Sequence, residues 1–246
     1  MPIKVPEGPP DDRFVYLSDV LPTAWQAVDY ADVPAGGSLV VLGLGPIGDM
    51  ATRIARHRGA ETVIGVDLVD ERLARARANG VEALDLREHD DLTATIRDLT
   101  DGRGPDSVID AVGMEAHGAP MAKLAHDLTG LLPSKLAEKF MKTAGIDRLA
   151  ALQAAIDIVR RGGTISIIGV YGGTADPLPL LTLFDKQIQV RMGQANVKRW
   201  VDDILPLLTS DDDPLGVDSF ATHHLPLAQA RRRTRCSRTR PTEPSR

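Results

Sequence analysis

The sequence is poor in cysteine and in aromatic residues: its 246 residues include one Cys, two Trp, three Tyr and four Phe. The lone Cys236 excludes an internal disulfide and a zinc lobe built from several cysteines. No apolar run approaches the roughly 18–20 residues of a membrane-spanning helix. The proline-rich N-terminus lacks the basic start and the apolar stretch of a secretory signal. We therefore expect a soluble, cytoplasmic protein without a membrane segment.

Charge is distributed unevenly along the chain. The net charge is −5, yet residues 231–246 contain seven Arg and a single acid. This stretch has no periodicity and no bulky apolar side chain, which predicts a disordered basic tail. A basic arm for nucleic acid is one interpretation, but the acidic body of the chain does not support it. A shifted reading frame or a truncated gene explains the tail better, so we expect no nucleic-acid partner.

Short apolar runs alternate with helical patterns along most of the chain. We expect strands at residues 38–43, 62–67, 82–86, 106–112, 165–169 and 187–192. Helices are expected at residues 18–31, 47–58, 70–79 and 90–99. Because right-handed crossovers place helices on both faces of a parallel sheet, this pattern predicts an α/β fold. We expect a doubly wound, parallel six-stranded sheet of the Rossmann type, for which 43% apolar residues provide an ample core.

An extra helical segment is expected between the fourth and fifth strands. Its apolar residues recur at spacings of three and four, which is typical of a helix that faces a core. They are Leu136, Phe140 and Met141 on one face and Leu149, Leu152, Ile156 and Val159 on another. Packing is the first interpretation, and a subunit contact or a cover over a cofactor is the alternative.

A glycine-rich sequence, Gly43-Leu44-Gly45-Pro46-Ile47-Gly48, stands between the first expected strand and the helix that follows. In dinucleotide-binding folds the first glycine permits a tight turn and the second lets the backbone approach the pyrophosphate. The third allows the helix to pack closely on the strand. The phosphates then meet the free N–H groups of the first helical turn. The pattern predicts a dinucleotide site at Gly43, Gly45, Pro46, Ile47 and Gly48.

Asp67 ends the second expected strand, 19 residues after Gly48. A carboxylate in this position accepts hydrogen bonds from the adenosine ribose and repels a 2′-phosphate, which favours NAD over NADP. Arg72 could contact the adenosine side of the cofactor or could be a solvated helix residue. The alternative for the whole motif is a glycine-rich turn that only joins strand to helix, with Asp67 at the start of the next helix.

From about residue 14 to residue 230 the chain resembles the C-terminal two-thirds of a zinc-dependent, medium-chain alcohol dehydrogenase. The resemblance rests on GLGPIG at 43–48, VIGVD at 63–67, SVIDAVG at 107–113, GGTISIIGVYGG at 162–173 and LSDVLPTAW at 17–25. The last motif is the most specific and is similar to the formaldehyde dehydrogenase-like branch. The resemblance implies three parts: a lead segment and helix from the catalytic-domain side (1–35), an NAD-binding Rossmann domain (36–230) and the tail (231–246).

Further site residues follow from this resemblance. It makes Asp19 a candidate zinc ligand, because this branch has an aspartate where most of the family has a cysteine ligand. The alternative is an acid placed near a helix N-terminus. Thr23 resembles a catalytic-site position beside the nicotinamide ring, or is an ordinary helix hydroxyl. Two strand ends resemble cofactor contacts, which are Val112 and Gly113 in one and Gly169, Val170 and Tyr171 in the other.

In the family the other two zinc ligands, a Cys and a His, come from an N-terminal GroES-like domain, which we expect to be missing here; the zinc site is then incomplete. The implied activity is hydride transfer between an alcohol or hydrated aldehyde and NAD. An inactive NAD-binding fragment, or a half-enzyme that needs a separate catalytic domain, remains the alternative. The resemblance also implies a homo-oligomer formed through the sheet edge at 187–192. Without the first domain, apolar surface around 14–30 is expected to be exposed.

Overall fold

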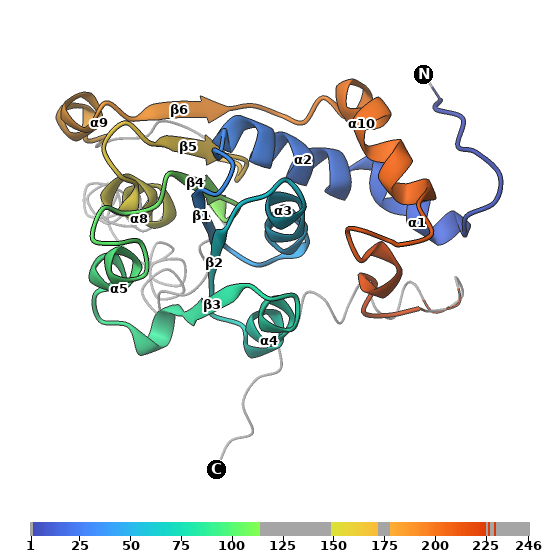
Figure 1. The fold of residues 1–246 in the computed structure, drawn as a ribbon, viewed down its shortest axis with the longest axis horizontal. Coiled ribbons are helices and arrows are strands. Elements are labelled where there is room, and N and C mark those ends of the chain that lie inside the picture. Colours follow the sequence, from blue (N-terminus) through green and yellow to red (C-terminus); the bar gives the residue numbers. More distant parts are fainter. Residues whose placement is uncertain (1, 114–148, 172–177, 225, 227–228, 230–246) are drawn as a thin grey trace, which may run out of the picture.

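The computed structural model describes residues 2–113, 149–171, 178–224, 226 and 229. Its strands form one parallel sheet in the order β3-β2-β1-β4-β5-β6 (Figure 1). They are β1 (Ser38–Leu42), β2 (Thr62–Asp67), β3 (Glu82–Asp85), β4 (Ser107–Asp110), β5 (Thr164–Ile167) and β6 (Gln189–Met192). The chain order reverses between β1 and β4, so the predicted doubly wound Rossmann topology is confirmed.

Helices cover both faces of this sheet (Figure 1). One face carries α2 (Val20–Ala31), α3 (Pro46–His57), α4 (Asp70–Ala78) and α10 (Val197–Thr209). The other carries α5 (Leu92–Asp98) and α8 (Ala150–Ile158). Successive side chains of a strand point to opposite faces. Accordingly Leu39 and Val41 of β1 belong to the first core, while Val40 and Leu42 belong to the second.

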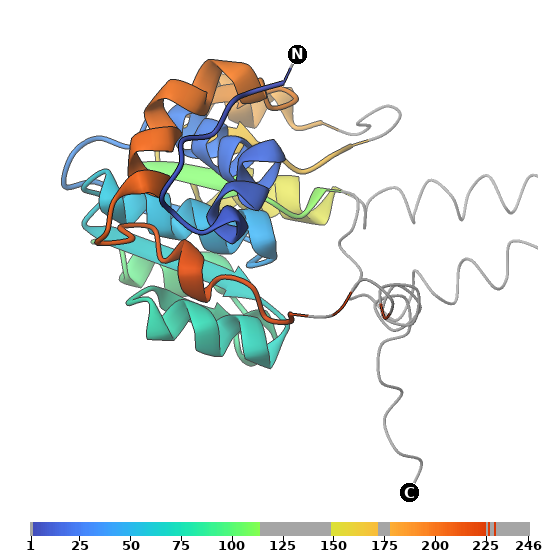
Figure 2. The same ribbon diagram turned by 90° about the vertical axis from the view of Figure 1, so that its right-hand side faces the viewer.

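The segment before the sheet is hydrogen-bonded to residues near the end of the described chain. It contains α1 (Asp11–Val15) and the short helix η1 (Tyr16–Ser18), which lie beside α10 (Figures 1 and 2). The buried Arg13 donates from Nε to Asp218 at 2.7 Å and from Nη1 to the carbonyl oxygen of Ser210 at 2.7 Å. Asp218 lies in the short helix η4 (Val217–Ser219). One guanidinium therefore joins residues about 200 positions apart in sequence.

The expected exposure of apolar surface around 14–30 is wrong for most of this segment. Leu21 is fully buried, and Trp25 and Val28 are 6% and 3% exposed. These side chains lie on α2, which packs between α3 and α10. Val15 is the exposed large apolar residue of this stretch. The helix is covered because it belongs to the same core as the sheet.

Several boundaries differ from those expected. The run at 187–192 does not begin as a strand, because Gln187 has a φ of 55° and ends α9 (Leu180–Lys186). Leu86 belongs to the short helix η2 (Leu86–Glu88) instead of β3. In the extra helical segment, Leu152 and Ile156 of α8 are buried as expected. Leu136, Phe140, Met141 and the tail at 231–246 lie outside the described residues. Within the described ranges no helix is long and apolar enough to cross a membrane.

Candidate functional site

The carboxyl ends of the parallel strands lie together on one side of the sheet, here called its carboxyl edge. The glycine-rich loop follows β1, Asp67 ends β2, and two further turns follow β4 and β5. In open α/β sheets ligands bind in the crevice beyond these ends, where the strand order reverses. The fold therefore brings the sequence-predicted cofactor residues to one edge, on both sides of the β1–β4 junction.

The three glycines of the loop differ in what surrounds them. Gly43 has a φ of 87°, and a methyl group on it would lie 2.8 Å from Cγ2 of Val112. A methyl group on Gly48 would lie only 1.8 Å from the carbonyl oxygen of Gly43, so α3 packs tightly on the loop. A methyl group on Gly45, by contrast, would meet no atom within 4 Å. The surroundings of Gly45 are open at the point where a pyrophosphate has to approach the backbone.

The N-terminus of α3 lies at this loop, with Gly45 as its N-cap residue and Pro46 in its first turn. The N–H groups of Ile47 and Gly48 have no acceptor within the helix, because they belong to its first turn. No side chain caps this end either. Such a helix end favours an anion. The nearby Asp49 is 2% exposed and pairs with Arg53 at 3.0 Å. Burial raises the pKa of Asp49, while Arg53 and Arg75 oppose that shift.

Asp67 joins the glycine-rich loop to the turn after β2. Its Oδ2 accepts from the N–H of Leu44 at 2.6 Å, and its Oδ1 accepts from Leu68 at 2.7 Å and Val69 at 2.9 Å. The side chain is buried within the protein at this edge. Val69, not Asp67, is the N-cap residue of α4. The alternative in which Asp67 starts that helix is therefore not what the structure shows.

Arg72 reaches back to the same carboxylate. Its Nη1 lies 3.3 Å from Oδ2 of Asp67, although its side chain is 47% exposed. Solvent screens the exposed guanidinium and weakens this ion pair, so a competing group can displace the arginine. When Arg72 moves away, one oxygen of Asp67 can accept a hydrogen bond from a ribose hydroxyl.

Two backbone turns complete the edge. Val112 and Gly113 follow β4, and their N–H groups donate to Oδ1 of Asp110 at 3.0 and 3.1 Å. Gly169 and Val170 follow β5, and a methyl group on Gly113 would lie 2.5 Å from the nitrogen of Val170. The turns therefore pack backbone against backbone. Sequence reasoning overlooked Asp110, although an acid at the end of an apolar strand was the available signal.

Asp19 and Thr23 lie together at the start of α2. The hydroxyl of Thr23 donates to Oδ1 of Asp19 at 3.0 Å, and Asp19 is exposed. Asp19 is the N-cap residue of α2, but its side chain caps no backbone N–H. Among the described residues no group of three or more His, Cys, Asp or Glu could hold a metal ion. A catalytic zinc takes three protein ligands, so these described residues alone do not make a zinc site.

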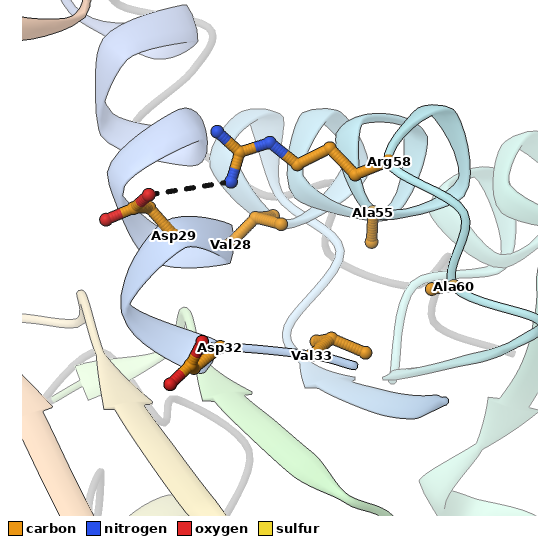
Figure 3. A pocket seen from close by; sticks show the side chains of 7 residues that line it. All are labelled: Val28, Asp29, Asp32, Val33, Ala55, Arg58 and Ala60. Carbon is orange, nitrogen blue, oxygen red and sulfur yellow. Dashed lines mark ion pairs between the residues drawn. The ribbon is translucent and has the colours of Figure 1, made fainter. Parts of the chain in front are cut away.

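A small pocket of about 120 Å³ lies elsewhere on the molecule (Figure 3). It lies between the ends of α2 and α3, and Arg58 pairs with Asp29 at 3.7 Å beside it. Its lining is Val28, Asp29, Asp32, Val33, Ala55, Arg58 and Ala60. Since α3 starts at the glycine-rich loop and ends here, the pocket belongs to the opposite edge of the sheet. It is also well below the roughly 300 Å³ of small ligand sites, so it is not the cofactor site.

Comparison with known proteins points to one family. Residues 46–129 match the family model described as zinc-binding dehydrogenase. A zinc-type alcohol dehydrogenase-like protein of Bacillus subtilis is 36% identical over 93% of this chain and 57% of its own length. The glutathione-independent formaldehyde dehydrogenase of the same organism is 33% identical over 65% of this chain and 34% of its own length.

The fold has matching solved structures as well. An alcohol dehydrogenase from Thermus sp. ATN1 superposes with a TM-score of 0.77 and 29% identity, over 96% of this chain and 58% of that protein. The chain thus spans about half the length of the relatives it matches. Taken with the glycine-rich loop, the aspartate that ends β2 and the sheet order, these similarities show that the chain belongs to the zinc-type alcohol dehydrogenase family.

Proposed function

We propose that this chain binds NAD at the carboxyl edge of its sheet. The observation that carries the proposal is the glycine-rich loop, in which Gly45 has open surroundings while Gly48 holds the uncapped end of α3 close to it. The pyrophosphate would lie against Gly45, Pro46 and Ile47. Asp67 would accept from the adenosine ribose, with Arg72 moving aside or contacting the adenosine. The proposed binding unit is residues 36–230.

The reaction we propose is the one that the family names suggest. NAD, when bound, supplies the acceptor for a hydride from an alcohol or a hydrated aldehyde. The formaldehyde dehydrogenase-like motif around Asp19 and the similarity to the Bacillus formaldehyde dehydrogenase favour small substrates of this kind. Asp19 would be this chain's zinc ligand in a complete site, with Thr23 holding its carboxylate. Among the described residues no group of three or more His, Cys, Asp or Glu could hold zinc, so the remaining ligands of such a site would have to come from outside these residues.

Calorimetric titration with NAD tests the proposal, because binding does not require a complete zinc site. The unmodified chain should bind NAD, and Gly45→Ala should weaken binding by about tenfold or more, since a methyl group blocks the approach of the pyrophosphate. The fold of this variant should be preserved, because Gly45 has a φ of −62° and space for a Cβ. Thermal unfolding provides the control. Failure of the unmodified chain to bind NAD would overturn the proposal.

The preference for NAD over NADP should depend on Asp67. A titration with NADP should give weaker binding than NAD, because the buried carboxylate repels the 2′-phosphate. In Asp67→Asn the affinity for NAD should fall by about 10-fold to 100-fold, the effect of losing a charge-assisted hydrogen bond. The affinity for NADP should fall less. An unchanged ratio of the two affinities would show that Asp67 does not face the ribose.

We also propose that two copies of the chain associate through β6. This strand pairs with β5 on one side, and Val190, Met192 and Phe184 of the adjoining α9 are 42%, 62% and 84% exposed. The N–H of Gln189 donates to Gly163 beside β5, so the N–H of Val190 points to the open edge. An exposed apolar edge strand is a template for pairing with another strand.

Light scattering after size-exclusion chromatography tests the association. The unmodified chain should be a dimer or larger, and Val190→Pro should be a monomer, because proline removes the outward N–H without breaking the β5–β6 ladder. Thermal unfolding of the variant checks that the ladder is intact. A monomer for the unmodified chain, or an unchanged assembly of the folded variant, would argue against pairing at β6.

A further inference from the structure

Asp110 is a fully buried acid at the end of β4, beside the proposed nicotinamide side of the crevice. Among the described residues no Lys or Arg forms an ion pair with it, so hydrogen bonds must stabilise the carboxylate. Oδ1 accepts from the N–H groups of Val112 and Gly113, and Oδ2 accepts from the hydroxyl of Tyr171. Tyr171 is therefore the one side chain that bonds the second oxygen among the described residues.

The hydroxyl of Tyr171 keeps its proton in this arrangement. Burial and the neighbouring Asp110 carboxylate both raise the pKa of Tyr171 above its ordinary value. A protonated hydroxyl donates to the carboxylate, and its single hydrogen is then used in the hydrogen bond to Asp110. This hydrogen is not available to a cofactor.

Asp110 also holds the turn after β5 through its backbone. Its carbonyl oxygen accepts from the N–H groups of Ile168 and Gly169 at 3.0 and 2.8 Å. The two turns touch, since a methyl group on Gly169 would lie 2.3 Å from the nitrogen of Gly113. A change in the position of either turn must therefore move the other.

We infer that Tyr171 is a positioning residue, which acts through Asp110 to hold the turns at 111–113 and 169–170 where the nicotinamide half of NAD binds. The inference rests on the proposed NAD site. In a doubly wound sheet each half of the fold takes one mononucleotide. Because Asp67 is the proposed acceptor for the adenosine ribose, the adenosine half of NAD would lie at β1–β3. The turns after β4 and β5 would then hold the nicotinamide half. Tyr171 then affects NAD binding without a hydroxyl contact to the cofactor.

Calorimetric titration with two probes, NAD and ADP, separates this role from a general structural one. ADP has the adenosine half and the pyrophosphate but no nicotinamide. Tyr171→Phe removes the hydroxyl and leaves Oδ2 of Asp110 without its donor. The affinity of this variant for NAD should fall by about tenfold, comparable to the loss of one hydrogen bond to a charged group. Its affinity for ADP should stay within about twofold, and thermal unfolding should show that it is folded.

Asp110→Asn is the conservative partner variant. Its Oδ1 can still accept from Val112 and Gly113, and its amide can donate to the phenolic oxygen of Tyr171. It should keep NAD affinity closer to that of the unmodified chain than Tyr171→Phe does. Equal losses for NAD and ADP in Tyr171→Phe, or no loss for either, would overturn the inference while leaving the NAD site intact. If the unmodified chain binds neither probe, the proposed function fails and the inference fails with it.

Discussion

Gly48→Ala should lower the free energy of unfolding by roughly 3–4 kcal/mol, because its new Cβ has no space. The methyl group would lie 1.8 Å from the carbonyl oxygen of Gly43 and 2.9 Å from its carbonyl carbon. Both are backbone atoms, so no side-chain rotation can relieve the overlap. Either α3 or the loop after β1 must move, and both belong to the core that includes Met50 and Ile54. The melting temperature should fall by on the order of 10 °C.

Gly45→Ala is the matched control for this experiment. It adds the same methyl group three residues earlier in the same loop, where no atom lies within 4 Å. Its melting temperature should stay near that of the unmodified chain, or rise slightly through the smaller entropy of the unfolded state. Gly48→Ala should therefore have a lower melting temperature, whereas Gly45→Ala should lose affinity for NAD without losing stability. Similar melting temperatures for both variants would show that α3 does not pack on the loop as described.

Gln26→Leu should lower the free energy of unfolding by a similar amount, roughly 3–5 kcal/mol. Gln26 is 1% exposed on α2, and every hydrogen-bonding position of its amide is used. Nε2 donates to the carbonyl oxygens of Gly193 and Gln194 at 3.0 and 3.1 Å. Oε1 accepts from the N–H of Asn196 at 3.0 Å and from the indole of Trp200 at 3.1 Å. A leucine leaves these four groups without their partner.

Urea unfolding followed by circular dichroism measures this effect. Gln194→Ala is a suitable control, because Gln194 is exposed and the variant keeps the carbonyl oxygen that Gln26 binds. Surface changes of this kind usually alter stability by less than about 0.5 kcal/mol. If Gln26→Leu were no less stable than Gln194→Ala, the amide would not be what joins α2 to the loop after β6.

Where the sequence predicted the fold well, the signals were local. The apolar runs of β1 and β2, the glycine-rich loop and the helix after it have the composition that such elements need. Asp67 could be assigned to a strand end because it directly follows an apolar run. These features depend on a few neighbouring residues, so no tertiary contact is needed to find them.

Other elements were missed because competing signals obscured them. In α10 the residues Trp200, Val201, Ile204 and Leu208 have helical spacing and are buried, but Pro206 inside the helix is a residue that normally ends one. At the start of β6, Gln187 adopts a left-handed conformation. A glutamine gives no sequence sign of that conformation, which glycine and asparagine favour.

The sequence by itself determined the strands, their parallel arrangement and the edge at which a dinucleotide is expected, because periodicity and glycine spacing are properties of neighbouring residues. Only the tertiary structure decided which partners meet across long separations. Tyr171 bonds Asp110, 61 residues away, and Gln26 bonds Trp200, 174 residues away. Their pairing is fixed by the packing of strands and helices, since burial forces each polar group to find an acceptor or a donor among the few that the fold brings near.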